Sequence, residues 1–366
     1  MLENTAYRLN NGLGLTVAYF GGSITEGAGS SSYDRCWAGR TTAWLRETWP
    51  GCEIKHVQAA IGGTDSSLGV HRCDRDVCSF RPDLVFYEFS VNDQDLDYGT
   101  ALRNTEACFR KIRTAVPEAE IVTVYTATKY LCDNMAQGRV LHARAAHSTV
   151  SHVYGIPEID IGGALMHRVL ADGSPEAGAD DWLRYTKDTV HPNDDGYAVY
   201  FSVLQARMRE WLEGAEKEAG LRPYPLPEPI VPDGESHMRA RMVDCLCAGY
   251  DGSWRVREEA LCGKYPRYIE CDQPGGGLEL EFEGKQIGVM WMMAKDSGDA
   301  VCAVDDGEPF TVSSWDKYCK DFSRANSAVI KSGLSDGRHV LKLKVSGTNS
   351  EGSEGHALRI GAFLVL

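Results

Sequence analysis

The chain lacks any long apolar run, and its first residues do not resemble a secretion signal. No apolar segment approaches the length needed to cross a bilayer. The opening residues, MLENTAYR, contain neither the basic start nor the apolar stretch of a signal peptide. The sequence therefore predicts a cytoplasmic protein with no membrane partner.

Positive charge is scarce. The chain has 38 lysines and arginines against 52 aspartates and glutamates, a formal net charge of −14. Binding to nucleic acid or to anionic lipid requires clustered basic side chains, and the sequence shows no such cluster. We therefore expect no nucleic-acid partner. The acidity is compatible with a neutral, polyhydroxylated ligand. The alternative is that the acidic side chains serve only to keep the protein soluble.

The usual sequence patterns of metal sites are missing. None of the twelve cysteines belongs to a C-x-x-C pair, and Cys245 and Cys247 are too close for ordinary zinc or disulfide geometry. His142, His147 and His152 recur every five residues, which distributes them around a helix. We expect reduced, buried thiols and no metal ion.

Nucleotide-binding loops are missing as well. The chain contains no G-x-x-x-x-G-K-[ST] loop, and the Gly-Ala-Gly at 27–29 continues into serines without the third glycine of a dinucleotide loop. We expect no cofactor.

What the chain does contain is a serine at a sharp turn. Residues 17–27 read VAYFGGSITEG, an apolar segment that stops at two glycines directly before Ser23. Glycine has no Cβ, so the backbone can turn sharply there and expose the next side chain at the carboxyl edge of a sheet. The same pattern fits an ordinary serine turn, so Ser23 is a candidate nucleophile only if partners exist.

A distant segment, 188–197, supplies two partners. It reads DTVHPNDDGY and places Asp188 three residues before His191. A serine needs a neutral imidazole to take its proton, and the imidazole needs a carboxylate on its other nitrogen. One turn of chain can bring the two side chains together. The alternative is a cap at the start of a helix beside a surface histidine.

Two further segments offer hydrogen-bond donors. Residues 58–65, QAAIGGTD, follow a strand-like stretch and can present a glycine N–H to a developing oxyanion. Residues 84–93, LVFYEFSVND, form an apolar strand that ends at Asn92, whose side-chain amide is a second possible donor. An Asn-Asp turn at the end of a strand is the alternative for Asn92.

Together the four segments resemble the SGNH hydrolase superfamily, also called GDSL esterases, whose four blocks carry Ser, Gly, Asn and His in this chain order. The resemblance covers about the first 215 residues, the size of one α/β domain. It implies that Ser23 is the nucleophile, His191 the general base and Asp188 the residue that orients it. It also implies that Gly63 and Asn92 join the backbone N–H of Ser23 in the oxyanion hole.

The chain departs from the family pattern at three places. Gly22 stands where the family usually has the Asp of Gly-Asp-Ser, Ser90 where it usually has Gly, and Gln58 where it usually has Asn. None of these changes removes a catalytic atom. The Gly-Gly-Ser-Ile-Thr form resembles the variant of carbohydrate esterases that deacetylate plant cell-wall sugars, more than it resembles lipases and lysophospholipases.

Two assignments have alternatives. Gly62 is the alternative to Gly63 as the oxyanion glycine, because the two are adjacent and the alignment can shift by one residue.

The other serine-hydrolase fold, the α/β-hydrolase, carries G-x-S-x-G in mid-chain. Here Thr25 occupies the last glycine position and the serine comes too early, which argues against that fold.

The pattern of the first 220 residues alternates short apolar strands with amphipathic helices. This order predicts a parallel sheet with helices on both faces, a flavodoxin-like three-layer α/β/α domain. Strands are predicted at 16–20, 53–57, 84–89, 121–125 and 156–159, and helices at 34–49, 100–115, 137–154 and 194–213. The predicted serine, glycine and asparagine donors follow strand ends, where ligands bind in open α/β sheets.

A second domain is predicted after a proline-rich stretch. Alternating prolines at 222–232 forbid a helix, so we assign 1–220 to the catalytic domain and 221–235 to a stiff linker. Strand-like alternation at 278–282, 287–292 and 340–345 and a hairpin signal at 305–307 predict a jelly-roll-like β-sandwich over 236–366. Such an appended sandwich resembles a carbohydrate-binding module.

Aromatic side chains are the candidates for substrate contact. Trp182 and Tyr185 lie in a predicted loop, 171–187, that precedes Asp188 and is expected to wall the site. Trp291 and Trp315 of the sandwich are candidate stacking platforms for sugars. For each of them the alternative is a structural role in a core or as a loop anchor.

The sequence therefore predicts a serine esterase that removes O-acetyl groups from plant cell-wall oligosaccharides of mannan or xylan type through an acyl-enzyme. One alternative keeps the machinery but acts on longer acyl chains or thioesters. The other is a catalytically silent glycan-binding protein.

Overall fold

The computed structural model describes residues 2–173, 177–215, 220–259, 261 and 265–366. The chain forms two compact units, Met1–Met238 and Arg239–Leu366. Each unit has its own hydrophobic core.

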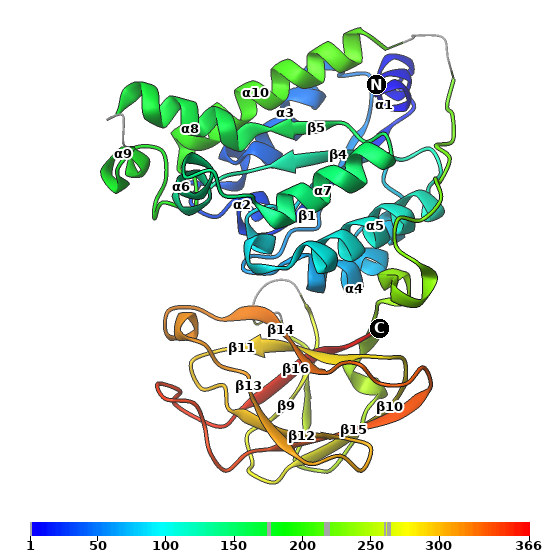
Figure 1. The fold of residues 1–366 in the computed structure, drawn as a ribbon, viewed down its shortest axis with the longest axis vertical. Helices are drawn as coiled ribbons and strands as arrows, with labels where there is room; N and C mark the ends of the chain where they lie inside the picture. Colours follow the sequence, from blue (N-terminus) through cyan, green and yellow to red (C-terminus); the bar gives the residue numbers. More distant parts are fainter. Residues whose placement is uncertain (1, 174–176, 216–219, 260, 262–264) are drawn as a thin grey trace. The chain divides into compact units, whose positions relative to one another are not determined.

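The first unit contains a five-stranded parallel sheet (Figure 1). Its strands are β1 (Leu15–Gly21), β2 (Ile54–Gln58), β3 (Leu84–Glu88), β4 (Glu120–Tyr125) and β5 (Glu158–Asp160). The spatial order is β2-β1-β3-β4-β5, the flavodoxin-like doubly wound order. Every residue of β3 and β4 is buried, as expected for strands that are covered on both faces.

Helices cover both faces of this sheet. They are α1 (Glu3–Asn11), α2 (Ser23–Glu26), α3 (Trp37–Thr48), α4 (Ser66–Asp76), α5 (Tyr98–Ala115), α6 (Lys129–Ala136), α7 (His142–Val153), α8 (Ile161–Asp172), α9 (Ala179–Leu183) and α10 (Asp194–Glu213). On one face α5 contacts α4 and α7, and on the other α10 contacts α1, α3 and α8 (Figure 1). The predicted three-layer α/β/α architecture is confirmed.

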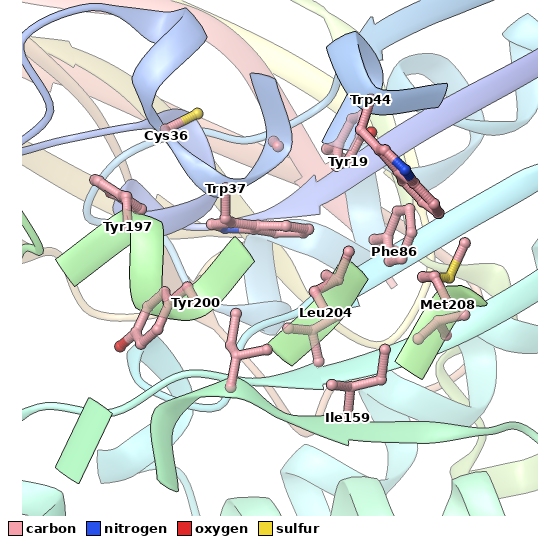
Figure 2. Packing of buried hydrophobic residues seen from close by; sticks show 14 of the residues in the cluster. Tyr19, Cys36, Trp37, Trp44, Phe86, Ile159, Tyr197, Tyr200, Leu204 and Met208 are labelled. Atoms are coloured by element: carbon pink, nitrogen blue, oxygen red, sulfur yellow. The ribbon is translucent and has the colours of Figure 1, made fainter. Parts of the chain in front are cut away.

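The core between the sheet and α10 is aromatic (Figure 2). Tyr19 of β1 stacks on Phe86 of β3 with ring centroids 5.3 Å apart, and Trp37 of α3 meets Phe86 edge-on at 5.7 Å. α10 contributes one buried face, with residues three or four apart: Tyr197, Tyr200, Leu204, Met208 and Trp211. Full burial of each large apolar side chain stabilises the fold by roughly 1.5–3 kcal/mol.

The proline-rich segment lies against the first unit. Tyr224 N–H donates to the Pro117 carbonyl at 2.7 Å. The N–H groups of Ile230 and Val231 donate to the Glu106 carboxylate at 2.7 and 2.9 Å. Because these bonds attach it along its length, the segment belongs to the first unit, and the division between units falls after Met238.

The second unit is a β-sandwich of antiparallel strands. They are β6 (Arg241–Asp244), β7 (Gly249–Tyr250), β8 (Arg255–Arg257), β9 (Tyr268–Cys271), β10 (Gly277–Glu283), β11 (Ile287–Met293), β12 (Asp299–Val304), β13 (Phe310–Ser313), β14 (Arg324–Lys331), β15 (Arg338–Val345) and β16 (Leu358–Val365). One sheet has the order β13-β12-β15-β10-β7 and the other β14-β11-β16-β9-β8, with β6 pairing to β16. The predicted sandwich is confirmed.

Local patterns in this unit follow from the sandwich. β10 alternates between buried and exposed residues because one of its faces meets solvent, and its buried side chains join the core that both sheets share. β12 and β13 pair in an antiparallel hairpin, and Asp305 in the connecting turn has a φ of 54°. The predicted hairpin is confirmed.

Among the described residues eleven cysteines are free, and all of them except Cys247 are buried. The twelfth, Cys262, lies outside the described residues. Within the same ranges, no helix combines the length and the apolar character needed to cross a membrane. No group of three or more His, Cys, Asp or Glu side chains in the described part is placed to hold a metal ion.

A histidine on β2 makes the stability of the first unit depend on pH. The His56 ring bonds to the Thr42 and Tyr33 hydroxyls at 2.7 and 2.8 Å and stacks on Tyr19. Burial lowers the pKa of His56 from 6.5 to about 4, with Arg46 adding to the effect. The unfolded chain therefore binds a proton at a higher pH than the folded chain does.

We expect the free energy of unfolding to fall as the pH is lowered from about 6.5 towards 4. Urea denaturation at a series of pH values measures this loss. His56→Asn keeps polar groups at the position and removes the titration, so its loss over the same window should be smaller. An identical pH dependence in both proteins would contradict the assignment.

Candidate active site

The nucleophile candidate lies where β1 passes into the short helix α2. β1 ends at Gly21 and α2 begins at Ser23. A Cβ on Gly21 would overlap the Glu88 carbonyl, and a Cβ on Gly22 would overlap the Asn92 side-chain amide. Gly21 therefore requires glycine, and a side chain at Gly22 would displace the Asn92 amide.

Ser23, His191 and Asp188 form one chain of hydrogen bonds. Ser23 Oγ lies 2.8 Å from His191 Nε2, and His191 Nδ1 lies 2.7 Å from Asp188 Oδ2. Asp188 Oδ1 accepts from the backbone N–H groups of His191 and Val190 at 2.8 and 3.1 Å. The structure thus brings together the three side chains that the sequence analysis selected, although about 165 residues of chain separate them.

Electrostatics favour one tautomer of the His191 ring. Burial raises the pKa of the Asp188 carboxyl, but hydrogen bonds from the His191 backbone and ring outweigh it and hold the pKa below its usual value. An ionised Asp188 accepts from Nδ1–H. Nε2 is then the basic nitrogen, and it accepts the Ser23 hydroxyl. This is the tautomer that a general base requires.

The glycine segment faces Ser23 directly. A Cβ on Gly62 would lie 3.5 Å from Ser23 Cβ and 2.6 Å from Glu26 Oε2. Gly62 N–H donates to Glu26 Oε2 at 2.7 Å, so a carboxylate already engages this N–H. Gly63 follows with a φ of 69°, a conformation that favours glycine. Of the two glycines, Gly63 remains our prediction for the oxyanion donor.

Asn92 opens the 3-10 turn η3 (Asn92–Asp95) directly after the loop that follows β3. Its side-chain amide packs where a side chain on Gly22 would lie, so it is next to the residue that precedes Ser23. This position beside the nucleophile is compatible with the predicted role of Asn92 as a second oxyanion donor.

Glu88 is a buried carboxyl that the sequence analysis missed. It ends β3, is fully buried, and accepts from Thr25 Oγ1 at 2.8 Å and Thr126 Oγ1 at 2.7 Å. Burial raises its pKa, and the two hydroxyls oppose that rise. The carboxyl therefore fixes α2, which carries Ser23, to the loop after β4. The signal in the sequence was a single acidic residue inside an apolar strand.

A second missed group is the buried pair of Asp93 and His147. Asp93 Oδ2 bonds to His147 Nε2 at 2.8 Å, and Asp93 Oδ1 accepts from Ser66 N–H at 2.7 Å. Neither side chain is more than 1% exposed. Asp93 follows Asn92 in the chain, and Ser66 comes three residues after Gly63. One carboxylate therefore connects the two segments that carry the predicted oxyanion donors.

Two of the four predicted sugar contacts are wrong. Trp182 and Trp291 are each 1% exposed and lie within the cores of their units, so neither ring presents a face to a ligand. Tyr185 donates its hydroxyl to the Asp172 carboxylate, and Lys320 lies 5.7 Å from the centre of the half-buried Trp315 ring. For Tyr185 and Trp315, sugar contact stays a prediction.

The segment expected to be a loop, 171–187, is partly helical. It contains the end of α8 and all of α9, while residues 174–176 lie outside the described residues. Trp182 is one of the α9 residues, and its position on the buried side of that helix explains why it packs into the core.

Comparisons with known proteins agree with this geometry. Residues 19–199 match the model of the GDSL-like Lipase/Acylhydrolase family. Two solved structures of a two-domain esterase active on acetylated mannans, one co-crystallised with mannopentaose, share the fold at a TM-score of 0.80 and 22% identity. The alignments cover 100% of this chain and 94% or 95% of theirs. No curated protein sequence in the comparison matches this chain. Over residues 19–199, the α/β unit of this chain is similar to the GDSL-like lipase/acylhydrolase family.

Proposed function

We propose that this protein is a serine esterase that releases acetyl groups from acetylated cell-wall oligosaccharides of mannan or xylan type. The observation that carries the esterase proposal is the hydrogen-bonded chain from Asp188 through His191 to Ser23. The likeness of both units to an esterase active on acetylated mannans supports the choice of substrate class.

The proposed reaction has two steps that use the same residues. Ser23 Oγ attacks the ester carbonyl while His191 Nε2 takes its proton, and the negative charge develops on the carbonyl oxygen. The backbone N–H groups of Ser23 and Gly63 and the Asn92 amide donate to that oxygen. Each such donor is worth roughly 3 kcal/mol in the transition state.

The intermediate then collapses. The bond between the acyl carbon and the sugar oxygen breaks, and His191 gives its proton to that oxygen, so that the sugar leaves with a free hydroxyl and the acetyl group stays on Ser23. Water gives a proton to His191 and attacks the acetyl-enzyme. The bond between the acetyl carbon and Ser23 Oγ then breaks, His191 returns the proton to Ser23 Oγ, and acetate leaves. The side chains of His191 and Asp188 are 27% and 53% exposed, so water can reach the base. Asp188 stabilises the positive imidazolium in both steps.

The test is a panel of acetylated manno- and xylo-oligosaccharides, followed by mass spectrometry. We expect progressive loss of acetyl groups and release of acetate. In a parallel series of aryl esters, acetate should be the preferred acyl group. Activity that rises with acyl length would instead support the longer-chain esterase or thioesterase. Oligosaccharide binding without hydrolysis of any ester would support the silent glycan-binding protein.

A further inference from the structure

A cavity of about 190 Å³ lies beside the predicted oxyanion segment. Its lining comes from the loop after β3, from η3, from α6, from the connection between α6 and α7 and from the first turn of α7. The lining includes Ser90, Gln94, Tyr130, Asn134 and Arg139. Neither the triad nor the predicted oxyanion donors line it, so it is a separate feature of the first unit.

The cavity is connected to both sides of the reactive centre. Ser90 and Gln94 lie two residues before and after Asn92, whose amide packs against Gly22. On the other side, the first residue of α6, Lys129, donates its N–H to the Thr189 carbonyl at 3.0 Å. Thr189 directly follows Asp188 in the chain. A ligand in the cavity is therefore close to the reactive centre.

The chemistry of the lining suits a sugar. Tyr130 is 58% exposed and Val140 is 67% exposed, so an aromatic ring and an apolar side chain of the lining are open to contact with a ligand. Arg139 donates to the Asn134 side-chain carbonyl at 3.0 Å, so a guanidinium and an amide lie together, and Gln94 adds a second amide. Sugars offer an apolar C–H face to aromatic rings and hydroxyls to amides and guanidinium groups.

We propose that this cavity binds a sugar ring next to the acetylated ring of the substrate. Tyr130 contacts the face of that ring, and Gln94, Asn134 and Arg139 bind its hydroxyls. The polar side chains favour a sugar over an acyl chain. The cavity is smaller than the pockets of about 300–1,000 Å³ that enclose drug-sized ligands, which suits one ring. The inference rests on the proposed function, since it assigns the substrate of the same site.

The kinetic test replaces Tyr130 with alanine. We expect kcat/KM for acetylated oligosaccharides to fall about tenfold, mainly through KM, because one aromatic contact is lost. Hydrolysis of an aryl acetate should not change, because such a small ester does not need the second ring site. Tyr130→Phe keeps the ring and should keep the oligosaccharide activity. Phe80→Ala, at a 55% exposed aromatic outside the lining, is the matched control.

A binding measurement separates this inference from the proposed function. In the Ser23→Ala background, calorimetry with an acetylated manno-oligosaccharide should show binding that Tyr130→Ala weakens about tenfold. Deacetylation by the parent protein with no effect of Tyr130→Ala overturns the sugar site alone. Equal losses on oligosaccharide and aryl acetate also overturn it. A Tyr130-dependent affinity without deacetylation supports the sugar site and contradicts the esterase. The absence of both binding and hydrolysis contradicts both proposals.

Discussion

Replacing Ser23 with alanine is expected to lower the hydrolysis of aryl acetates by about four to six orders of magnitude, with no loss of fold. The substitution removes only the side-chain hydroxyl, and the proposed mechanism places the acetyl group on the oxygen of that hydroxyl. Stopped assays of acetate release against the uncatalysed background measure the drop. The residual rate reflects binding and the oxyanion donors alone.

Two controls make the Ser23 result specific. Ser202→Ala removes an exposed serine hydroxyl from α10 that donates only locally, to the Val199 carbonyl, and should leave the rate unchanged. His191→Ala should cost nearly as much as Ser23→Ala, and the double variant little more, because the residues act as a unit. Full turnover by Ser23→Ala, or additive losses in the double variant, would refute the nucleophile and base assignment.

Replacing Asp93 with alanine is expected to have the largest effect on stability, a loss of about 3–5 kcal/mol in the free energy of unfolding. The substitution leaves His147 Nε2 and the Ser66 N–H in the core without their acceptor. A buried polar group without a partner costs roughly 1–3 kcal/mol, and this substitution leaves two such groups without an acceptor. Urea denaturation measures the loss.

The Asp93 prediction also has a kinetic part. Since this carboxylate connects the segments of Gly63 and Asn92, we expect kcat to fall in the folded fraction while KM changes little. Asp93→Asn keeps an acceptor for Ser66 N–H and should lose less of both quantities. Asp95→Ala, at an exposed aspartate two residues on, is the matched control and should change neither. A stable Asp93→Ala protein with normal kcat would show that the link is unimportant.

Sequence patterns were sufficient where one physical rule dominates. The strand prediction for 16–20 matches β1, Leu15–Gly21, and the helix prediction for 194–213 matches α10 at both ends. β1 is a short apolar run that is buried along nearly its whole length. α10 buries side chains three or four residues apart, and Asn193 caps it through its side chain.

The missed helix α4 lacks such a period. α4 was not predicted because its buried side chains include polar ones. Arg72 is fully buried, donates to the Ala59 and Gly21 carbonyls and lies over the Phe20 ring. The predicted helix 137–154 begins only at His142, because α6 ends at Ala136 and Gly138 takes a φ of 73°. These outcomes depend on tertiary contacts that a local pattern does not contain.

The site residues show the same contrast between signals in the local sequence and signals that depend on tertiary contacts. Ser23, His191 and Asp188 were selected because their chemistry requires those residue types in a recognisable local setting. The supporting carboxyls Glu88 and Asp93 act through partners far along the chain, so their roles emerge only in the folded protein. The tryptophans at 182 and 291 were misjudged because an aromatic side chain suits a core and a sugar site equally well.

The most direct test of the account is mass spectrometry of the protein after reaction with an aryl fluorophosphonate. In this reaction the serine oxygen bonds to phosphorus and fluoride leaves. We expect one adduct, on the peptide that contains Ser23, and a much slower reaction in His191→Ala. An adduct on another residue, or labelling of Ser23 that does not depend on His191, would contradict the assignment of Ser23 as the nucleophile activated by His191.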